Sequence, residues 1–435
     1  MSIEFCTQAG KMGGPIKTGI QEYDNNPLID ACGPLRDRLQ TAKNLIVIPT
    51  VPGNLQKIQN HVRLHQLMSV RDLHIPTESG IDLAMTLDLI LRQSYIKRAP
   101  RDPATWFYLY QSRPFNAADS SPLLCASAVG ISGSGKSVAC ERALSQYQQV
   151  VIHPKFPSLV SPMKQLVWLK VDVPASGRLI DLTEALMRVT DEALNEDYFS
   201  DYLKRASRRG FNGWQSWCHK ASSNFIGILV LDEIQNFFQI ESVKARKQAK
   251  SRGHVSELRV VEDGTLKAIL NFVNSSRIGL IVMGTPDGMA AFCKRFSTGQ
   301  RMVNAGHHTF SPMRHIDDIF FAKYFFPALV KYQWADEAID NFDEIRSIFH
   351  DLSGGGQRIG ISLWIHAHRC MWSRGGKRLE VRDFQIASDT YLSPLRPAIE
   401  ALKSGDPKGL ALYEDLLPRD DPLWMQMISA EVGLY

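Results

Sequence analysis

Between residues 121 and 312, short apolar runs alternate with longer amphipathic stretches. The apolar runs are rich in Val, Ile and Leu without polar alternation, which is typical of parallel strands buried on both faces. The stretches between them have helical spacing, and a helix joining two such strands is the connection that a parallel sheet needs. The pattern predicts strands at 123–130, 165–173, 225–233 and 278–285. It also predicts a helix that begins at Ser137, a helix over 179–194, polar helices from there to about residue 222, and a helix over 265–273.

The pattern of apolar strands is confined to residues 121–312 and is absent before and after them. This change of pattern divides the chain into separate units. The first 120 residues are punctuated by Pro and Gly and then become helical near 80–98. Helical patterns return after 312, and a stretch rich in Pro, Gly and Asp begins at 404. We therefore expect an α/β core with a parallel sheet between two mostly helical pieces. The expected units are an N-terminal region at 1–120 (a possible partner-docking region), a core at 121–312, a helical subdomain at 313–403 and a tail at 404–435.

Composition narrows the class of protein but does not name a partner. The chain has 435 residues, 44% of them hydrophobic, which excludes wholesale disorder and fibrous repeats. Its longest apolar runs, 225–231 and 278–283, are far shorter than the ~18 residues of a membrane span. The N-terminus lacks the pattern of a secretory signal, so a soluble cytoplasmic protein with no membrane partner is expected. Seven cysteines without a CxxC pair indicate reduced thiols rather than disulfides or zinc.

The sequence GISGSGKS at 130–137 matches the phosphate-loop pattern GxxxxGK[ST] in full, after a predicted strand and at the start of a helix. Glycines let backbone N–H groups turn toward the phosphates, and the helix N-terminus adds positive charge. Lys136 is expected to reach the β- and γ-phosphates, and the Ser137 hydroxyl to ligate Mg²⁺. The predicted nucleotide-binding residues here are Gly130, Ser132, Gly133, Ser134, Gly135, Lys136 and Ser137.

The apolar run IGILVLDE at 226–233 ends in two acids. Asp232 at the strand end is expected to hold the hydration shell of Mg²⁺, and Glu233 to act as general base on the attacking water. An adjacent Asp-Glu pair favours a hydrolysing or switch-type ATPase over a small-molecule kinase. ATP and Mg²⁺ are therefore the predicted substrate and cofactor.

Three further positions are candidates for the same site. Thr285 ends the next predicted strand, where a polar side chain can position the lytic water as sensor 1 of AAA+ proteins does. Arg295 and Arg301 follow the next helix, where an arginine of an AAA+ oligomer projects into the neighbouring subunit's site. Arg358 follows three glycines and opens a helix, which fits either a sensor 2 arginine or a simple hinge.

Together these segments resemble the TnsC/TniB-type AAA+ regulators of Tn-seven-like bacterial DNA transposons. The resemblance runs over roughly 23–416. It rests on motifs spread along the chain: EYDNNPLIDACGPL, SYIKRAP, GISGSGKS, SQYQQVVIH, KVDVPASG, ILVLDEIQNF, VMGTPDG, LVKYQW, LSGGGQR and LSPLRPAIEALKSGDP. The family has paired arginines where this chain has Gln300 and Arg301, which favours Arg301 over Arg295 as the finger. The implied fold is an AAA+ P-loop NTPase with a helical C-terminal lid.

What the resemblance implies is an ATP-dependent regulator of DNA transposition. Such proteins assemble on double-stranded target DNA, without sequence specificity, as hexamer- or heptamer-like rings or helical filaments. They link a TniQ/TnsD-type target selector to a TnsA/TnsB-type transposase, and ATP hydrolysis disassembles them. A nucleoid-associated location follows from that role.

Net charge is only +5, but basic residues concentrate in two runs without an intervening acid. Repeated in every subunit of a ring, such runs would neutralise phosphates without reading bases. A solvated basic surface is the competing interpretation for both. The candidate DNA-binding residues are Lys204, Arg205, Arg208 and Arg209 in the first run, Lys220 on the following helix, and Lys244, Arg246 and Lys247 in an expected loop.

Two other ATPase classes remain as alternatives. An Orc/Cdc6-like or DnaA-like initiator would carry a winged-helix or helix-turn-helix after the lid, and a STAND-type signalling ATPase would carry repeats; the sequence indicates neither. The histidine pairs 61/65, 307/308 and 366/368 lack a third ligand and are expected on surface helices. Trp214 and Trp217 are expected in the core.

Overall fold

The computed structural model describes residues 17–110, 124–204, 210–240, 258–260, 263–293 and 296–404. Within these residues no helix is long and apolar enough to cross a membrane. The basic residues Arg205, Arg208, Arg209, Lys244, Arg246 and Lys247, together with Arg295 and the tail from 405, lie outside the described ranges.

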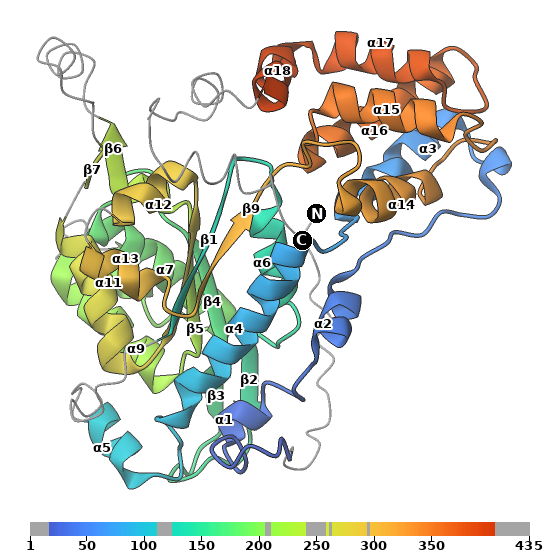
Figure 1. Ribbon diagram of the computed structural model, residues 1–435. Coiled ribbons are helices and arrows are strands. Elements are labelled where there is room, and N and C mark those ends of the chain that lie inside the picture. The colour runs from blue at the N-terminus through green and yellow to red at the C-terminus, as the bar shows by residue number, and fades with distance from the viewer. Residues whose placement is uncertain are drawn as a thin grey trace, which may run out of the picture.

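The centre of the described chain is a five-stranded parallel sheet with the order β4-β5-β8-β1-β9 (Figure 1). The predicted parallel α/β core is therefore confirmed. Its strands are β1 (Cys125–Gly130), β4 (Trp168–Asp172), β5 (Ile228–Asp232), β8 (Gly279–Gly284) and β9 (Gly306–Phe310).

Helices cover both faces of the sheet, because successive residues of each buried strand point to opposite layers. On β5, Leu229 and Leu231 join one apolar cluster, and Ile228 and Val230 join the other. The first cluster contains α7 (Leu179–Leu194), α9 (Gly210–Ser223) and α11 (Asp263–Ser276), with Trp214 and Trp217 buried in it as expected. The second contains α1 (Pro27–Asp30), α4 (Glu78–Ile96) and α6 (Lys136–Leu144).

Smaller elements complete the core. Short helices extend its two layers: α2 (Arg38–Leu45), α5 (Pro103–Tyr110), α8 (Ser200–Lys204), η3 (Ile234–Phe237), α12 (Pro286–Cys293) and α13 (Phe296–Met302). Two antiparallel pairs lie outside the central sheet: β2 (Val150–His153) with β3 (Met163–Leu166), and β6 (Phe238–Ile240) with β7 (Leu258–Val260).

The C-terminal helices form a separate layer beside the carboxyl edge of the sheet (Figure 1). This lid has its own apolar cluster, dominated by aromatic side chains such as Phe349 and Trp364. Its helices are η4 (Phe321–Phe325), α14 (Phe326–Lys331), α15 (Phe342–Ser353), α16 (Gln357–Ser373), α17 (Val381–Tyr391), η5 (Ser393–Leu395) and α18 (Arg396–Ser404).

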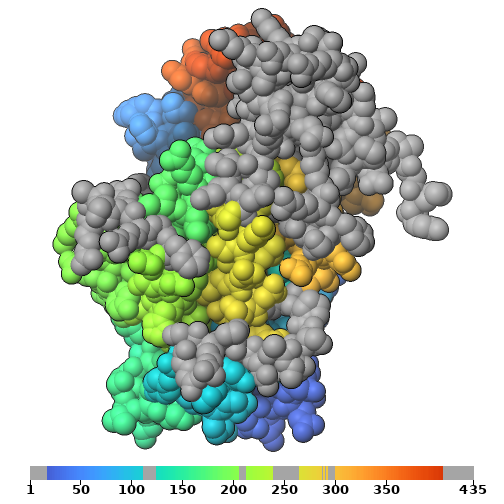
Figure 2. All heavy atoms as spheres, turned by 90° about the vertical axis from the view of Figure 1, so that its left-hand side faces the viewer, coloured from blue at the N-terminus to red at the C-terminus, as the bar shows by residue number. Residues whose placement is uncertain are grey.

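An N-terminal segment packs into this lid rather than onto the core. It contains η1 (Leu55–Lys57), α3 (Asn60–Leu67) and η2 (Met68–Asp72). Leu67 and Val70 belong to the lid cluster, and the buried Arg63 pairs with Asp336 at 2.8 Å. Figures 1 and 2 both show this blue segment beside the orange C-terminal helices. The lid is thus built from two parts of the chain that are far apart in sequence.

Several local expectations are corrected by the structure. The strand expected over 165–173 is two strands, since Leu166 ends a pair with β2 and Trp168 begins the pairing with β5. His307 and His308 lie on strand β9, not on a surface helix, and His307 Nδ1 is 2.7 Å from Ser127 Oγ. His368 is helical but fully buried. His61 and His65 lie exposed on helix α3 as expected, and His366 is half-buried on α16.

Candidate nucleotide site

The loop after β1 makes a tight reversal for which its glycines are required. A Cβ on Gly130 would lie 2.6 Å from the carbonyl oxygen of Phe310. Gly133 and Gly135 have φ angles of +80° and +91°, a region that side chains strongly disfavour. Helix α6 begins at Lys136, directly after Gly135. The loop therefore has the strand–glycine turn–helix form of a phosphate-binding loop.

The ends of three neighbouring strands are level with this loop. Val129 of β1 is paired with Gly284 of β8, and Val282 of β8 with Leu231 of β5. The residues that follow these pairs, Asp232 and Thr285, therefore lie at the same carboxyl edge as the loop. Predicted side chains from separate parts of the sequence are thus brought to one edge of the sheet.

Asp232 is buried and held on both oxygens. Oδ1 accepts a hydrogen bond from the Glu233 backbone N–H at 2.9 Å, and Oδ2 is 3.3 Å from Lys170 Nζ. The Lys170 ammonium also lies 2.8 Å from Glu141 on α6. Burial lowers the pKa of Lys170, but the hydrogen bond to Glu141 and the charge of Asp232 outweigh it and raise the pKa above its usual value. Lys170 is therefore a permanent cation beside Asp232.

Glu233 has a backbone conformation that a non-glycine residue seldom adopts, with φ of +58°. The turn that follows is anchored by Asn236, whose side-chain amide donates to the carbonyl oxygen of Val173 at 2.7 Å. The Glu233 carboxylate accepts a hydrogen bond from Gln235 Nε2. The local fold thus fixes both the backbone and the carboxylate of this residue.

Two hydroxyl groups at this edge are buried without a hydrogen-bond partner among the described residues. They are Ser134 Oγ in the loop and Thr285 Oγ1 after β8. A buried polar atom normally has a partner, and such an exception at a candidate site indicates a place for a ligand's polar atom. Both residues were predicted from the sequence to contact the nucleotide or the lytic water.

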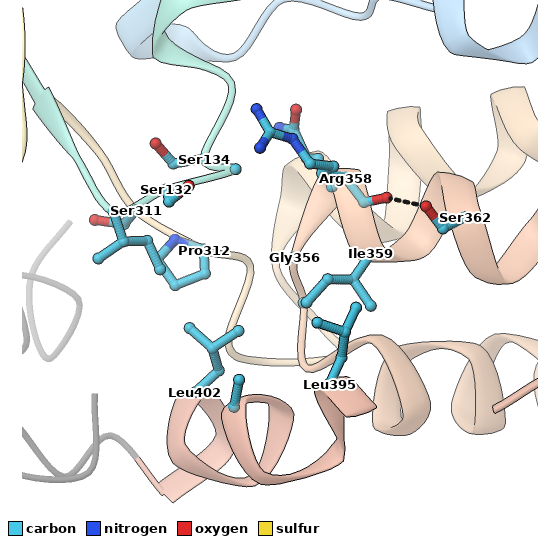
Figure 3. A pocket seen from close by; sticks show the side chains of 15 residues that line it. Ser132, Ser134, Ser311, Pro312, Gly356, Arg358, Ile359, Ser362, Leu395 and Leu402 are labelled. Atoms are coloured by element: carbon cyan, nitrogen blue, oxygen red, sulfur yellow. Dashed lines mark hydrogen bonds between the residues drawn. The ribbon is translucent and has the colours of Figure 1, made fainter. Parts of the chain in front are cut away.

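The lid brings Arg358 to the loop. Gly354 and Gly355 have φ angles of +58° and +69°, and Gly355 accepts from the backbone N–H of Met313 at 3.1 Å. This turn places the start of α16 so close that a Cβ on Gly133 would lie 3.5 Å from the Cβ of Arg358. Figure 3 shows the guanidinium pointing toward the loop that carries Ser134. Loop and lid line a cleft of about 270 Å³ between them.

A second cavity, of about 700 Å³, adjoins the first and shares Ser134, Ser311 and Pro312 with it. It lies between the lid and the two ends of the N-terminal segment. These two ends are joined by antiparallel backbone hydrogen bonds of 2.9 Å between Val47 and His74. Its lining is mainly apolar and includes Ile46, Ile75, Pro76, Ile319, Phe320 and Tyr324. The cleft and the cavity are therefore continuous around Ser134, and both have mainly apolar linings.

The remaining predicted residues lie away from this edge or outside the described ranges. Arg301 is exposed in the last turn of α13, and Lys204 is exposed at the end of α8. Lys220 is not free: its ammonium lies 2.6 Å from Glu196 and 4.5 Å from the centre of the Tyr198 ring. Within the described residues, no group of three or more His, Cys, Asp or Glu side chains could hold a metal ion by itself.

Two side chains at the site were not predicted from the sequence. Lys170 interrupts the apolar residues Trp168–Val171 of β4, and that interruption was an available signal. Gln235 gave no local signal, because its partner Thr285, which follows β8, lies 50 residues further along the chain.

Comparison with known proteins agrees with this geometry. A family model described as "AAA domain" matches residues 123–290. With the observed strand order and phosphate loop, it shows that the core has the α/β fold of an AAA+ P-loop NTPase. A search of curated proteins found no matching sequence.

Solved structures show similarity at low identity. They include the Aeropyrum pernix ORC2 protein in ADPNP and ADP complexes (11% identity, 77% of this chain and 84% of that chain, TM-score 0.38). Drosophila ORC bound to DNA is similar at 10% identity over 92% and 84% (TM-score 0.39). The Thermotoga maritima RuvB Holliday junction branch migration motor is similar at 12% identity over 76% and 84% (TM-score 0.35). Similarities this weak do not relate details of the sites.

Proposed function

We propose that this protein binds ATP with Mg²⁺ at the carboxyl edge of the sheet and hydrolyses it. The observation that carries the proposal is the meeting, at one edge, of the loop around Lys136, the Asp232–Glu233 pair and Thr285. Strand registers place these three elements level with one another. A buried hydroxyl without a partner at Thr285 and an arginine from the lid support the same function.

The oxygen donors at this edge fit magnesium, which prefers carboxylate and hydroxyl ligands and keeps several waters. Ser137 would ligate the ion from the first turn of α6, and Asp232 would hold its hydration shell. When bound, Mg²⁺ would neutralise negative charge that develops on the phosphate oxygens.

Each protein group then has a defined task in the hydrolysis. Lys136 and the loop N–H groups hold the β- and γ-phosphates, and Arg358 adds positive charge from the lid. Glu233 takes a proton from the water whose oxygen attacks the γ-phosphorus, while Thr285 orients that water. The bond from the γ-phosphorus to the bridging oxygen breaks, and ADP leaves with that oxygen. An exposed Arg301 fits a role in the site of a neighbouring subunit.

The apolar cavity is the place for the adenosine part of ATP. It adjoins the cleft at Ser134, so a nucleotide with its phosphates at the loop would extend into it. Ile75 and Pro76 come from the N-terminal segment, Ile319 from the connection to the lid and Tyr324 from the lid helix η4. Burial of the adenine ring between these two groups of residues would link nucleotide binding to the position of the lid.

We further propose that the ATP-bound form assembles on double-stranded DNA as a regulator of transposition. The support is the resemblance of motifs along the chain to TnsC/TniB-type regulators and the two basic runs at 204–209 and 244–252. The proposed partners are further copies of this chain, a TniQ/TnsD-type target selector and a TnsA/TnsB-type transposase. Since Lys220 is paired with Glu196, it is a weaker candidate for phosphate contact than Lys204.

The hydrolysis is tested with Glu233→Gln, which keeps the shape of the side chain and removes its basicity. Phosphate release is expected to fall by about 10² to 10³-fold, because general-base catalysis contributes this much. Binding of a fluorescent ATP analogue should persist. A variant that hydrolyses ATP at the wild-type rate would overturn the assignment of the base.

DNA binding is tested by fluorescence anisotropy with labelled duplex DNA at several salt concentrations. Charge reversal at Arg208 and Arg209 should weaken binding and reduce the slope of its salt dependence by about one for each phosphate that is no longer neutralised. Reversal of the exposed Arg382 on the lid is the control. An unaltered slope would exclude the two arginines from phosphate contact.

A further inference from the structure

The side-chain amide of Gln235 lies between the proposed base and the end of the neighbouring strand. Its Oε1 accepts a hydrogen bond from the backbone N–H of Thr285 at 3.2 Å. Its Nε2 donates to Oε2 of Glu233. One side chain thus joins Glu233, after β5, to Thr285, after β8.

The orientation of this amide follows from chemistry. A backbone N–H can only donate, so the amide atom that faces Thr285 must be the oxygen. The amide nitrogen therefore faces the Glu233 carboxylate, which accepts. The Thr285 backbone N–H fixes the position of the amide oxygen of Gln235. Because the amide is planar, the direction of its Nε2 donor toward Glu233 is fixed as well.

Two glycines allow the close approach of Gln235 to its neighbours. A Cβ on Gly284 would lie 2.7 Å from Oε1 of Gln235, and one on Gly288 would lie 3.0 Å from its Cα. Both positions are glycine, one at the end of β8 and the other on α12. The close approach makes the position of Gln235 depend directly on the strand end that carries Thr285.

We propose that Gln235 is a positioning residue for the hydrolysis: it holds the Glu233 carboxylate in register with Thr285. This inference rests on the proposed ATPase function. The amide occupies Oε2 of Glu233, so Oε1 is the oxygen that would accept the proton of the attacking water. The same amide fixes the strand end whose hydroxyl orients that water, so base and water are aligned by one side chain.

Gln235→Ala removes both hydrogen bonds, and steady-state hydrolysis and ATP-analogue binding report its effect. The turnover number is expected to fall about tenfold, as for loss of an orienting hydrogen bond near the reacting atoms. The Michaelis constant and the analogue's dissociation constant should change by less than about twofold, because the side-chain hydrogen bonds of Gln235 go to Glu233 and Thr285 rather than to groups of the phosphate loop. Gln385→Ala, an exposed glutamine on α17, is the matched control and should leave both constants unchanged.

Gln235→Glu keeps the size of the side chain and its acceptor for Thr285 but turns a donor into a carboxylate facing Glu233. It should reduce turnover more than Gln235→Ala does, since two like charges repel the base from its position. Melting temperatures establish that each variant is folded. If Gln235→Ala does not fold, the nearly isosteric Gln235→Glu and its wild-type-like melting temperature carry the test.

A double-mutant cycle with Glu233→Gln separates positioning from a merely structural role. If Gln235 acts mainly through Glu233, Gln235→Ala should cause much less than a tenfold additional loss of single-turnover rate in the Glu233→Gln background. An additive tenfold loss, or unchanged turnover in the single variant, would overturn the proposal. A wild-type protein that releases no phosphate from ATP would instead overturn the proposed function itself.

Discussion

Two buried polar side chains, His368 in the lid and Thr285 at the edge of the core, have opposite surroundings. His368 accepts from the Trp334 backbone N–H at 3.1 Å through Nε2 and lies 2.8 Å from the Trp364 carbonyl oxygen through Nδ1. Thr285 Oγ1 is buried without a partner among the described residues. A buried group that is paired within the chain stabilises the fold, whereas an unpaired one costs stability and is available to a ligand.

The largest expected effect separates these two roles. His368→Ala leaves a cavity and two backbone groups without partners, so it should lower the free energy of unfolding of the lid by about 3–5 kcal/mol. Chemical denaturation followed by tryptophan fluorescence measures this, since Trp334 and Trp364 pack beside His368.

Thr285→Ala is the matched counterpart. Within the described part of the chain it removes no hydrogen bond, so stability should change by less than about 1 kcal/mol, while ATP hydrolysis should fall at least about tenfold. Equal loss of stability in both variants would remove the distinction between a structural and a functional polar group.

Acid should destabilise the lid through the same histidine. Burial lowers the pKa of His368 to about 4, against the opposing effects of its bond to Trp364 and the charge of Asp383. The unfolded chain, with an ordinary histidine pKa near 6.5, then binds a proton that the folded chain does not. Stability is therefore full above pH 6.5 and falls as the pH drops toward 4, by at most about 3 kcal/mol.

Protonation of His368 would also break its hydrogen bond with Trp334. The proton on Nε2 would face the Trp334 backbone N–H, so that two donors would point at each other. Thermal unfolding between pH 7 and 4.5 measures the effect. His368→Gln, which cannot acquire this charge, should show a weaker dependence on pH, and an identical dependence would contradict the assignment to His368.

The smallest effect concerns Lys170, which pairs with a buried acid at the site. Lys170→Met should leave Asp232 without its cation and lower stability by about 1–3 kcal/mol in metal-free buffer, with partial recovery on addition of Mg²⁺. Lys403→Met is the control, because its partner Asp351 is exposed and such pairs contribute less than about 1 kcal/mol. The melting temperatures of the two variants are measured with and without Mg²⁺. Equal losses of stability in both variants, without any effect of Mg²⁺, would contradict the account.

Sequence predicted the parts of this site that depend on local pattern. The loop at 130–137 and the Asp232–Glu233 pair each follow a buried apolar strand. A window of about ten residues therefore predicts the element that carries each motif, its position at the strand end and its chemical role. Strand β9 escaped prediction because it is an edge strand with the sequence GHHTF and has no continuous apolar run.

Long-range packing accounts for what the pattern could not predict. The pairing of Arg63 with Asp336, which places α3 in the lid, joins residues that no local spacing relates. The same holds for Gln235 and Thr285, and for the approach of Arg358 to Gly133. Such contacts are fixed by the assembled core and lid rather than by any one segment.

The central claim, that the phosphate loop holds ATP, is tested most directly by titration calorimetry with Mg²⁺-ATP. Glu233→Gln prevents turnover and serves as the reference protein, and Lys136→Ala is added to it. The account predicts saturable binding to the reference and at least about a hundredfold weaker binding once Lys136 is removed, because the phosphates then lack a buried, charge-assisted hydrogen-bond donor. Equal affinity in the two proteins would contradict it.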